Sequence, residues 1–240
     1  KTGAYALVDG NTGVVIFDPD PDAMASFDLK FAKAHDAESL ALAAAFDPAI
    51  TKDGLRVEVV ANIGGEEDAL FANEHGAEGV GLFRTEFLYL HRVSEPTEEE
   101  QVVAYQQVFK HFKGQPVVVR TLDIGGDKEV PYMNFPKELN PFLGWRGVRM
   151  LEGREDLMVT QIRALLRSSI GVDLRVMVPM IARLDEILAV RKIIDEQRAQ
   201  LDKEGIPYGT KFQFGIMVEV PSAALMADKL ARYIDFFSIG

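Results

Sequence analysis

The chain has 240 residues, of which 48% are hydrophobic and 26% are charged, so it is long and apolar enough to form a substantial core. Its 26 basic and 37 acidic side chains give a formal net charge of −11, which argues against nucleic acid as a partner and means that a small anion would need a local cluster of arginines. The absence of cysteine excludes disulfides and zinc–thiolate sites, and no apolar run is long enough for membrane insertion, so we expect a cytoplasmic protein.

The first part of the chain predicts two short strands followed by a long helix. Residues 1–21 contain two short apolar segments around the turn Asp9-Gly10-Asn11. The run Asp18-Pro-Asp-Pro-Asp then interrupts the chain, and an Ala-rich helix with scattered charges is expected over about 23–45. Such a helix is typical of a connector. Because the first residue is lysine, we expect the chain to be a fragment of a longer protein.

From Arg56 onward, predicted strands and helices alternate. The strands are continuously apolar, which is typical of a parallel sheet covered by helices on its faces. They are expected near 57–62, 80–84, 117–121, 174–179, 213–219 and 235–239. The helices between them are expected over 66–76, from the capping box at Thr97 to about 112, and over 154–169, 185–205 and 222–233. A (β/α)8 barrel and a doubly wound sheet both fit this alternation. With six strands, the α/β fold would be a (β/α)8 TIM-type barrel that is incomplete, having six of eight βα units.

Charged side chains end three of these strands. Arg84 follows the apolar run 80–83, Arg120 follows 117–119, and Glu219 stands at the far end of FGIMVEV. Ligand sites of parallel α/β folds lie at the carboxyl ends of the strands. Two guanidiniums there can clamp a phosphate or a carboxylate, and a facing carboxylate can bind Mg²⁺ together with substrate oxygens.

Two further cations follow nearby in the sequence. Lys128 closes the glycine-containing loop Asp123-Ile-Gly-Gly-Asp-Lys128, and Arg146 ends the segment 140–146. Structural explanations remain open for each charge. A lone arginine at a strand end is more often an ion-pair partner than a ligand, so Arg84 could pair with Glu86 and Arg120 with Asp123. These explanations do not account for the charges falling at the same end of their strands.

Several motifs resemble Enzyme I of the bacterial sugar phosphotransferase system, a phosphoenolpyruvate–protein phosphotransferase. They are GVGLFRTEFLYL, TEEEQ, VVVRTLDIGGDKEVPYMNFPKELNPFLGWRGVR, MVPMI and FGIMVEVPSAALMADKLARYIDFFSIG. The resemblance implies that Arg84 and Arg120 are catalytic and bind the phosphate of phosphoenolpyruvate, that Lys128 and Arg146 lie at the same substrate pocket, and that Glu219 is a Mg²⁺ ligand.

The resemblance also implies a domain organisation. Residues 1–21 would be the tail of a swivelling phosphohistidine domain, residues 22–50 a linker helix, and residues 51–240 the phosphoenolpyruvate-binding (β/α)8 barrel, truncated at its C-terminus. The phosphoryl group would pass to a histidine of the swivelling domain and then to the carrier protein HPr for sugar uptake, and the barrel would form a homodimer. The acceptor histidine and some substrate-binding residues would lie outside this chain, so we expect the chain alone to be inactive.

Two alternatives stay open. The barrel of pyruvate phosphate dikinase or phosphoenolpyruvate synthase has similar arginines, although the DIGGDK motif favours Enzyme I. A non-catalytic dimerisation module is the alternative of a different class.

Overall fold

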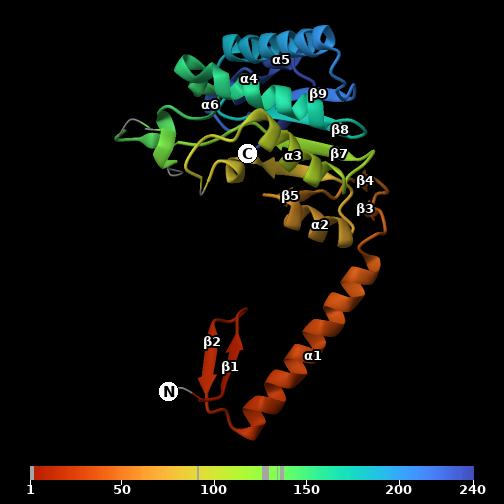
Figure 1. The fold of residues 1–240 in the computed structure, drawn as a ribbon. Helices are drawn as coiled ribbons and strands as arrows, with labels where there is room; N and C mark the ends of the chain where they lie inside the picture. The colour runs from red at the N-terminus through yellow and green to blue at the C-terminus, as the bar shows by residue number, and fades with distance from the viewer. Residues whose placement is uncertain (1–2, 91, 126–129, 134, 136–137) are drawn as a thin grey trace. The chain divides into compact units, whose positions relative to one another are not determined.

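The computed structural model describes residues 3–90, 92–125, 130–133, 135 and 138–240 (Figure 1). The chain forms two compact units, residues 1–47 and 48–240, which are described separately.

The first unit consists of a hairpin and one helix. Strands β1 (Ala6–Asp9) and β2 (Val14–Phe17) pair antiparallel. The turn between them is closed by the carboxylate of Asp9, which accepts the backbone N–H of Asn11 at 3.0 Å. Helix α1 (Pro21–Ala44) begins two residues earlier than predicted, because Asp20 caps it and proline is favourable at the first helical position. None of the residues of α1 is buried.

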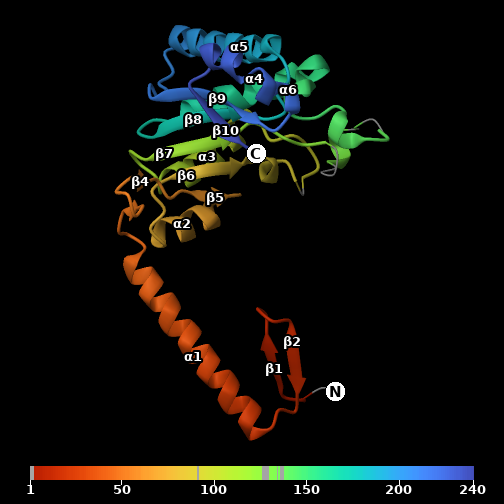
Figure 2. The same ribbon diagram turned by 180° about the vertical axis from the view of Figure 1, so that it is seen from behind.

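The second unit is built on a six-stranded sheet in the order β10-β9-β8-β7-β6-β5, in which every neighbouring pair is parallel (Figures 1 and 2). The strands are β5 (Ala61–Ile63), β6 (Val80–Arg84), β7 (Pro116–Arg120), β8 (Asp173–Val178), β9 (Phe212–Val218) and β10 (Phe236–Ile239). The sheet curls as part of a barrel, so the predicted incomplete (β/α)8 barrel is confirmed.

Helices follow the strands and cover the sheet. They are α2 (Glu66–Glu74), α3 (Glu98–Phe109), α4 (Leu151–Ser168), α5 (Leu184–Glu204), α6 (Pro221–Leu225) and α7 (Ala227–Leu230). One hydrophobic core joins strand side chains such as Phe83 and Val176 to helix side chains such as Ile162 and Ile194. Burial of this apolar surface is the main stabilising contribution to the unit.

Local signals explain where the longer helices begin and end. Thr97 and Glu100 form the predicted capping box of α3: the hydroxyl of Thr97 accepts the N–H of Glu100, and the carboxylate of Glu100 accepts the N–H of Thr97. Helix α5 ends at Gly205, which has the left-handed conformation (φ 68°) that glycine adopts without steric cost.

The first predicted strand of the sheet is wrong in part. Residues 56–57 form β4 (Arg56–Val57), which pairs antiparallel with β3 (Ala49–Ile50), and the parallel sheet begins only at Ala61. Glu78 is the reason, since its carboxylate pairs with Arg56 and accepts the N–H of Val59 at 2.9 Å. Glu78 therefore holds the segment before β5 with its side chain and also with its backbone N–H, which donates to the oxygen of Val59 at 2.8 Å.

Two helices in the structure also differ from the helices predicted from the sequence. The helix expected over 222–233 is divided at Met226 into α6, α7 and a short 3-10 turn. Helix α4 includes a kink over Glu152–Arg154, where Gly153 has a φ of 95°. Within the described part of the chain, no helix has the length and apolarity needed to cross a lipid bilayer.

The capping box provides a test of the local fold. We expect Thr97→Ala to lower the free energy of unfolding by about 1 kcal/mol, because the first turn of α3 loses its side-chain acceptor. Denaturant titration followed by circular dichroism measures the change. Thr210→Ala, at an exposed threonine outside any helix, is the matched control. Equal effects of the two substitutions would show that the cap contributes nothing.

Candidate functional site

The predicted site residues Arg84 and Arg120 lie side by side at the carboxyl edge of the sheet. Arg84 is the last residue of β6 and Arg120 the last residue of β7, and their Cα atoms are partners in the strand register. Glu219 follows β9 directly at the same edge. Parallel strands therefore bring together charges that are far apart in the sequence.

Arg120 is buried and paired with two carboxylates. Its Nη2 lies 2.6 Å from Oε1 of Glu86, and its Nη1 lies 3.4 Å from Oδ2 of Asp123. The predicted pairing of Arg120 with Asp123 is thus present. Glu86, which was expected to pair with Arg84, pairs with Arg120 instead. Glu86 lies just beyond the end of β6, so the parallel register sets it against the end of β7.

Arg146 binds the other side of Asp123. Its Nε and Nη2 lie 3.0–3.1 Å from the two carboxylate oxygens, and its guanidinium lies 5.3 Å from the centre of the Phe142 ring. We call Glu86, Arg120, Asp123 and Arg146 the buried ion cluster. It holds two guanidiniums and two carboxylates, so these four formal charges sum to zero.

Gly125 allows the loop after β7 to approach Arg146. It has a φ of 105°, and a Cβ added there would lie 2.8 Å from the backbone oxygen of Trp145. A larger residue would be strained in this conformation and would collide with the backbone. The close approach made by this glycine is therefore to the chain's own segment 145–146.

Arg84 differs from the other two arginines. It is partly exposed, and no carboxylate of the described residues lies within ion-pair distance of it. Its guanidinium lies 4.9 Å from the centre of the Phe87 ring, and its buried Nε has no hydrogen-bond partner among the described residues. The proposed pairing of Arg84 with Glu86 is therefore wrong, and Arg84 offers donors to an anion.

Glu219 is exposed, and Oε1 accepts the backbone N–H of Met180 at 2.7 Å. Met180 has a φ of 64°, a left-handed conformation that costs a non-glycine residue about 1–3 kcal/mol and is often found at functional sites. Oε2 of Glu219 has no partner among the described residues. The alternative of a structural ion pair between Glu219 and the arginines is not observed.

The loop after β7 and the segment before α4 enclose a small second core. Its buried members are Tyr89, Leu122, Ile124, Val130, Met133, Met150 and Leu157. Burial raises the pKa of Tyr89 well above its usual value, so its hydroxyl stays neutral. This core anchors the loop that carries Asp123.

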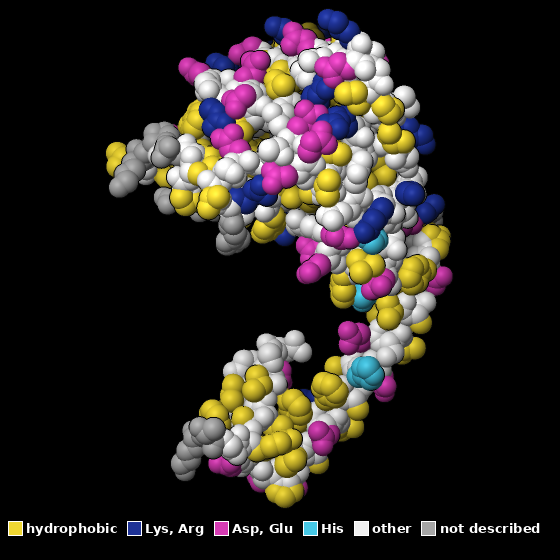
Figure 3. Space-filling model, in the orientation of Figure 1, with side chains coloured by type: hydrophobic (Ala, Val, Ile, Leu, Met, Phe, Trp, Pro, Cys, Tyr) yellow, Lys and Arg dark blue, Asp and Glu magenta, His cyan; other side chains and the backbone are white. Residues whose placement is uncertain are grey.

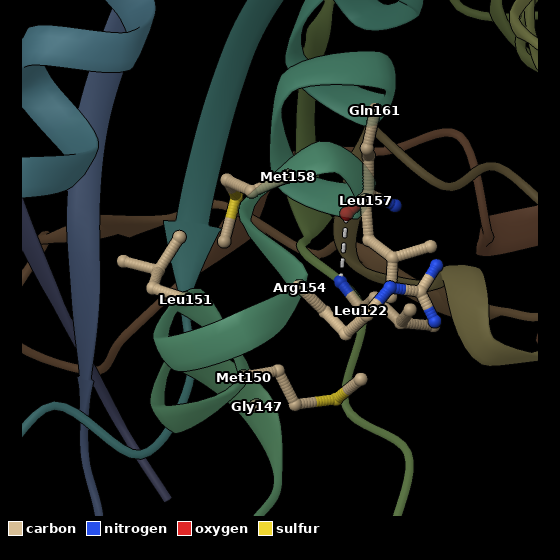
Figure 4. Close-up of a pocket in the computed structure, with 8 residues that line it drawn as sticks. All are labelled: Leu122, Gly147, Met150, Leu151, Arg154, Leu157, Met158 and Gln161. Carbon is tan, nitrogen blue, oxygen red and sulfur yellow. Dashed lines mark hydrogen bonds between the residues drawn. The ribbon is translucent and has the colours of Figure 1, made fainter. Parts of the chain in front are cut away.

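A cavity of about 10 Å³ lies beside this core, which is about the room for one water molecule (Figure 4). Its lining residues are Leu122, Gly147, Met150, Leu151, Arg154, Leu157, Met158 and Gln161. It is too small to hold a substrate.

The remaining predictions concern Lys128 and a metal site. Lys128 lies outside the described residues. Among the residues that are described, no group of three or more His, Cys, Asp and Glu side chains is placed to hold a metal ion. Over the face of the second unit shown in Figure 3, acidic side chains lie among basic ones, so this face has no broad basic surface.

Comparison with known proteins shows the family to which this chain is similar. A family described as "PEP-utilising enzyme, PEP-binding domain" matches residues 40–240. Curated relatives include proteins named phosphoenolpyruvate-protein phosphotransferase from Geobacillus stearothermophilus (47% identical over 240 residues, 100% of this chain), Lactococcus lactis subsp. lactis strain IL1403 (46% over 241 residues, 99%) and Streptococcus equinus (48% over 244 residues, 100%). The chain spans 42% of the length of each of these relatives.

The buried ion cluster predicts a large stability effect. Asp123→Ala should lower the free energy of unfolding by about 3–5 kcal/mol, because two buried guanidiniums lose a shared carboxylate. Asp156→Ala is the matched control, since Asp156 pairs with Arg154 at an exposed position and should change stability by about 1 kcal/mol or less. Chemical denaturation of both variants measures the difference, and similar losses would contradict the assigned role of the cluster.

Proposed function

The chain belongs to the family of PEP-utilising enzymes, whose PEP-binding domain it carries, and from this premise we propose that its second unit binds phosphoenolpyruvate for a phosphotransferase. In the proposed reaction, the phosphoryl group of phosphoenolpyruvate moves to a histidine of the same enzyme and then to the carrier protein HPr. The acceptor histidine belongs to a part of the enzyme outside this chain. The curated relatives that match the whole chain are named for this activity, which favours it over a dikinase or a synthase.

The observation that carries the proposal is the guanidinium of Arg84, which has no carboxylate partner among the described residues and lies next to Arg120 in the strand register. A phosphate dianion accepts charge-assisted hydrogen bonds from such a fork. Arg120 is held by Glu86 and Asp123, so its orientation is fixed before a ligand arrives.

This arrangement suits phosphoryl transfer. In that reaction negative charge is spread over the oxygens of the transferring group, and the protein contributes chiefly by positioning and electrostatic stabilisation. We assign Arg84 and Arg120 as catalytic residues that bind these oxygens throughout the transfer. Arg146 supports the site indirectly: it binds the carboxylate of Asp123, which also pairs with Arg120. Lys128 is assigned to the same pocket on the family resemblance.

Glu219 is proposed as a ligand of Mg²⁺. Its exposed carboxylate fits this ion, which usually takes one or two protein carboxylates and completes its shell with water and substrate oxygens. The N–H of Met180 fixes one carboxylate oxygen and leaves the other available. When bound, Mg²⁺ would offset negative charge on the substrate oxygens.

The remaining partners follow from the family resemblance. We propose that the full-length protein acts in the cytoplasm in sugar uptake and forms a homodimer through the barrel unit. Exposed apolar side chains on this unit, Leu139, Leu143 and Ile239 among them, provide surface of the kind that such contacts bury.

The arginines give a direct test in the full-length protein. Arg84→Ala should lower kcat/KM for phosphoenolpyruvate by about 100-fold or more, because an unpaired donor to the phosphoryl oxygens is lost. Its melting temperature should change little, since Arg84 makes no ion pair with the described residues. Arg120→Ala should abolish transfer and also destabilise the fold, because it opens the buried ion cluster.

Arg56→Ala is the matched control for these variants, since Arg56 pairs with Glu78 at the opposite, exposed end of the unit. Steady-state kinetics and thermal unfolding of all three variants separate catalysis from stability. Unchanged kcat/KM in Arg84→Ala would overturn the assignment of the site.

The metal assignment predicts a separate result. Glu219→Gln should raise the Mg²⁺ concentration needed for half-maximal activity by about tenfold or more, because a neutral amide is a weaker ligand for a hard cation. The melting temperature should change little, since the amide oxygen can still accept the N–H of Met180. A Mg²⁺ titration of activity, compared with that of Glu196→Gln on the exposed face of α5, makes the measurement. A fall in stability with an unchanged Mg²⁺ response would show that Glu219 is structural.

A further inference from the structure

Gln161 is a fully buried polar side chain in the middle of α4, where most of the buried residues are apolar. It makes three hydrogen bonds to other elements. Its Oε1 accepts the backbone N–H of Leu122 at 2.8 Å, and its Nε2 donates to Oγ1 of Thr85 at 3.0 Å and to the hydroxyl of Tyr105 at 3.1 Å. Figure 4 shows the Gln161 side chain directed toward Leu122.

The direction of these hydrogen bonds is determined by their chemistry. The N–H of Leu122 can only donate, so the side-chain oxygen of Gln161 must face it and the amide nitrogen must donate to both hydroxyls. The hydroxyl of Thr85 then donates to the backbone oxygen of Arg120 at 2.8 Å. On the other branch, the hydroxyl of Tyr105 donates to Gln101 at 3.0 Å. Each of the two amide hydrogens of Gln161 has one acceptor, and so do the hydroxyl hydrogens of Thr85 and Tyr105.

The network ends on the backbone next to both proposed substrate-binding arginines. Thr85 directly follows Arg84, and the carbonyl that it holds belongs to Arg120. Leu122 lies two residues after Arg120, immediately before Asp123. One side chain therefore connects the ends of β6 and β7.

We propose that Gln161 is a positioning residue for phosphoenolpyruvate binding, which fixes the spacing between the backbones of Arg84 and Arg120. This inference rests on the proposed function. Gln161 acts only through Thr85 and Leu122 and makes no contact with substrate. A displacement of binding groups by about 1 Å can lower the rate by about 100-fold even when its cause lies away from the substrate.

The packing around Gln161 supports this role. The adjacent cavity of about 10 Å³ is lined by Gln161 itself and by Leu122, so the backbone there is not held by close packing on every side. Hydrogen bonds must therefore set the position of the strand ends. An apolar side chain of similar size would fill the space but would leave the N–H of Leu122 without its acceptor.

The test uses the full-length protein and three variants. Gln161→Met keeps the length of the side chain and removes all three hydrogen bonds. Thr85→Val keeps the shape of the side chain and removes both the hydrogen bond to the backbone oxygen of Arg120 and the one from Gln161, while Gln161 keeps its bonds to Leu122 and Tyr105. Tyr105→Phe is the matched control, because it alters the same buried network on the branch that leads to Gln101 and away from the arginines. The dissociation constant for phosphoenolpyruvate is measured by titration calorimetry in the presence of Mg²⁺, together with kcat, KM and the melting temperature.

We expect Gln161→Met and Thr85→Val each to weaken phosphoenolpyruvate binding by about 10–100-fold. Tyr105→Phe should lower the melting temperature and leave the dissociation constant within about twofold of wild type. If Gln161→Met does not fold, Thr85→Val decides the question alone. Wild-type binding by Thr85→Val, or equal weakening by all three variants in proportion to their melting temperatures, would overturn the proposal.

Arg84→Ala is measured in parallel to separate this inference from the proposed function. Loss of binding in Arg84→Ala, with wild-type binding in Gln161→Met and Thr85→Val, would overturn the positioning role and leave the proposed function intact. Wild-type binding in Arg84→Ala would overturn the proposed function itself.

Discussion

Asp123 lies between the guanidiniums of Arg120 and Arg146, and the geometry of the candidate site depends on this buried contact. Charges removed from water are tolerated only when they are paired and hydrogen-bonded. With Glu86 completing the cluster, the two arginines are neutralised by groups of the protein itself. Their positions are therefore determined by the fold, while the neighbouring Arg84 keeps donors for a ligand.

The parallel sheet makes this arrangement possible. Its register places the last residues of β6 and β7 side by side, so a guanidinium ends each of two adjacent strands. The ion pairs of Arg120 and the hydrogen bonds of the Gln161 amide both act at these strand ends. Ion pairs and neutral hydrogen bonds thus constrain the same few residues. Both act in a buried environment, where electrostatic interactions are stronger than in water.

A site organised in this way is suited to a reaction that needs positioning more than covalent chemistry. Arg120 and Arg146 are held by carboxylates of the protein, so these two arginines would not have to reorganise if a phosphate arrived, and little binding energy would be lost in ordering them. Glu219 is held differently, by the strained backbone of Met180, and its carboxylate stays exposed. The arginines and Glu219 are therefore supported by separate elements.

The sequence by itself determined the α/β class, five of the six parallel strands and the position of Arg84, Arg120 and Glu219 at strand ends, because continuous apolar runs and the charges that end them are local patterns. Only the tertiary structure decided which carboxylate pairs with which arginine. Glu86 is two residues from Arg84 in the sequence but binds Arg120, since strand register and not sequence distance sets the contact. The contacts of Val59 and Gln161 were decided in the same way. They depend on partners 19 to 76 residues away, Glu78 for Val59 and Thr85 for Gln161, and no local pattern records such contacts.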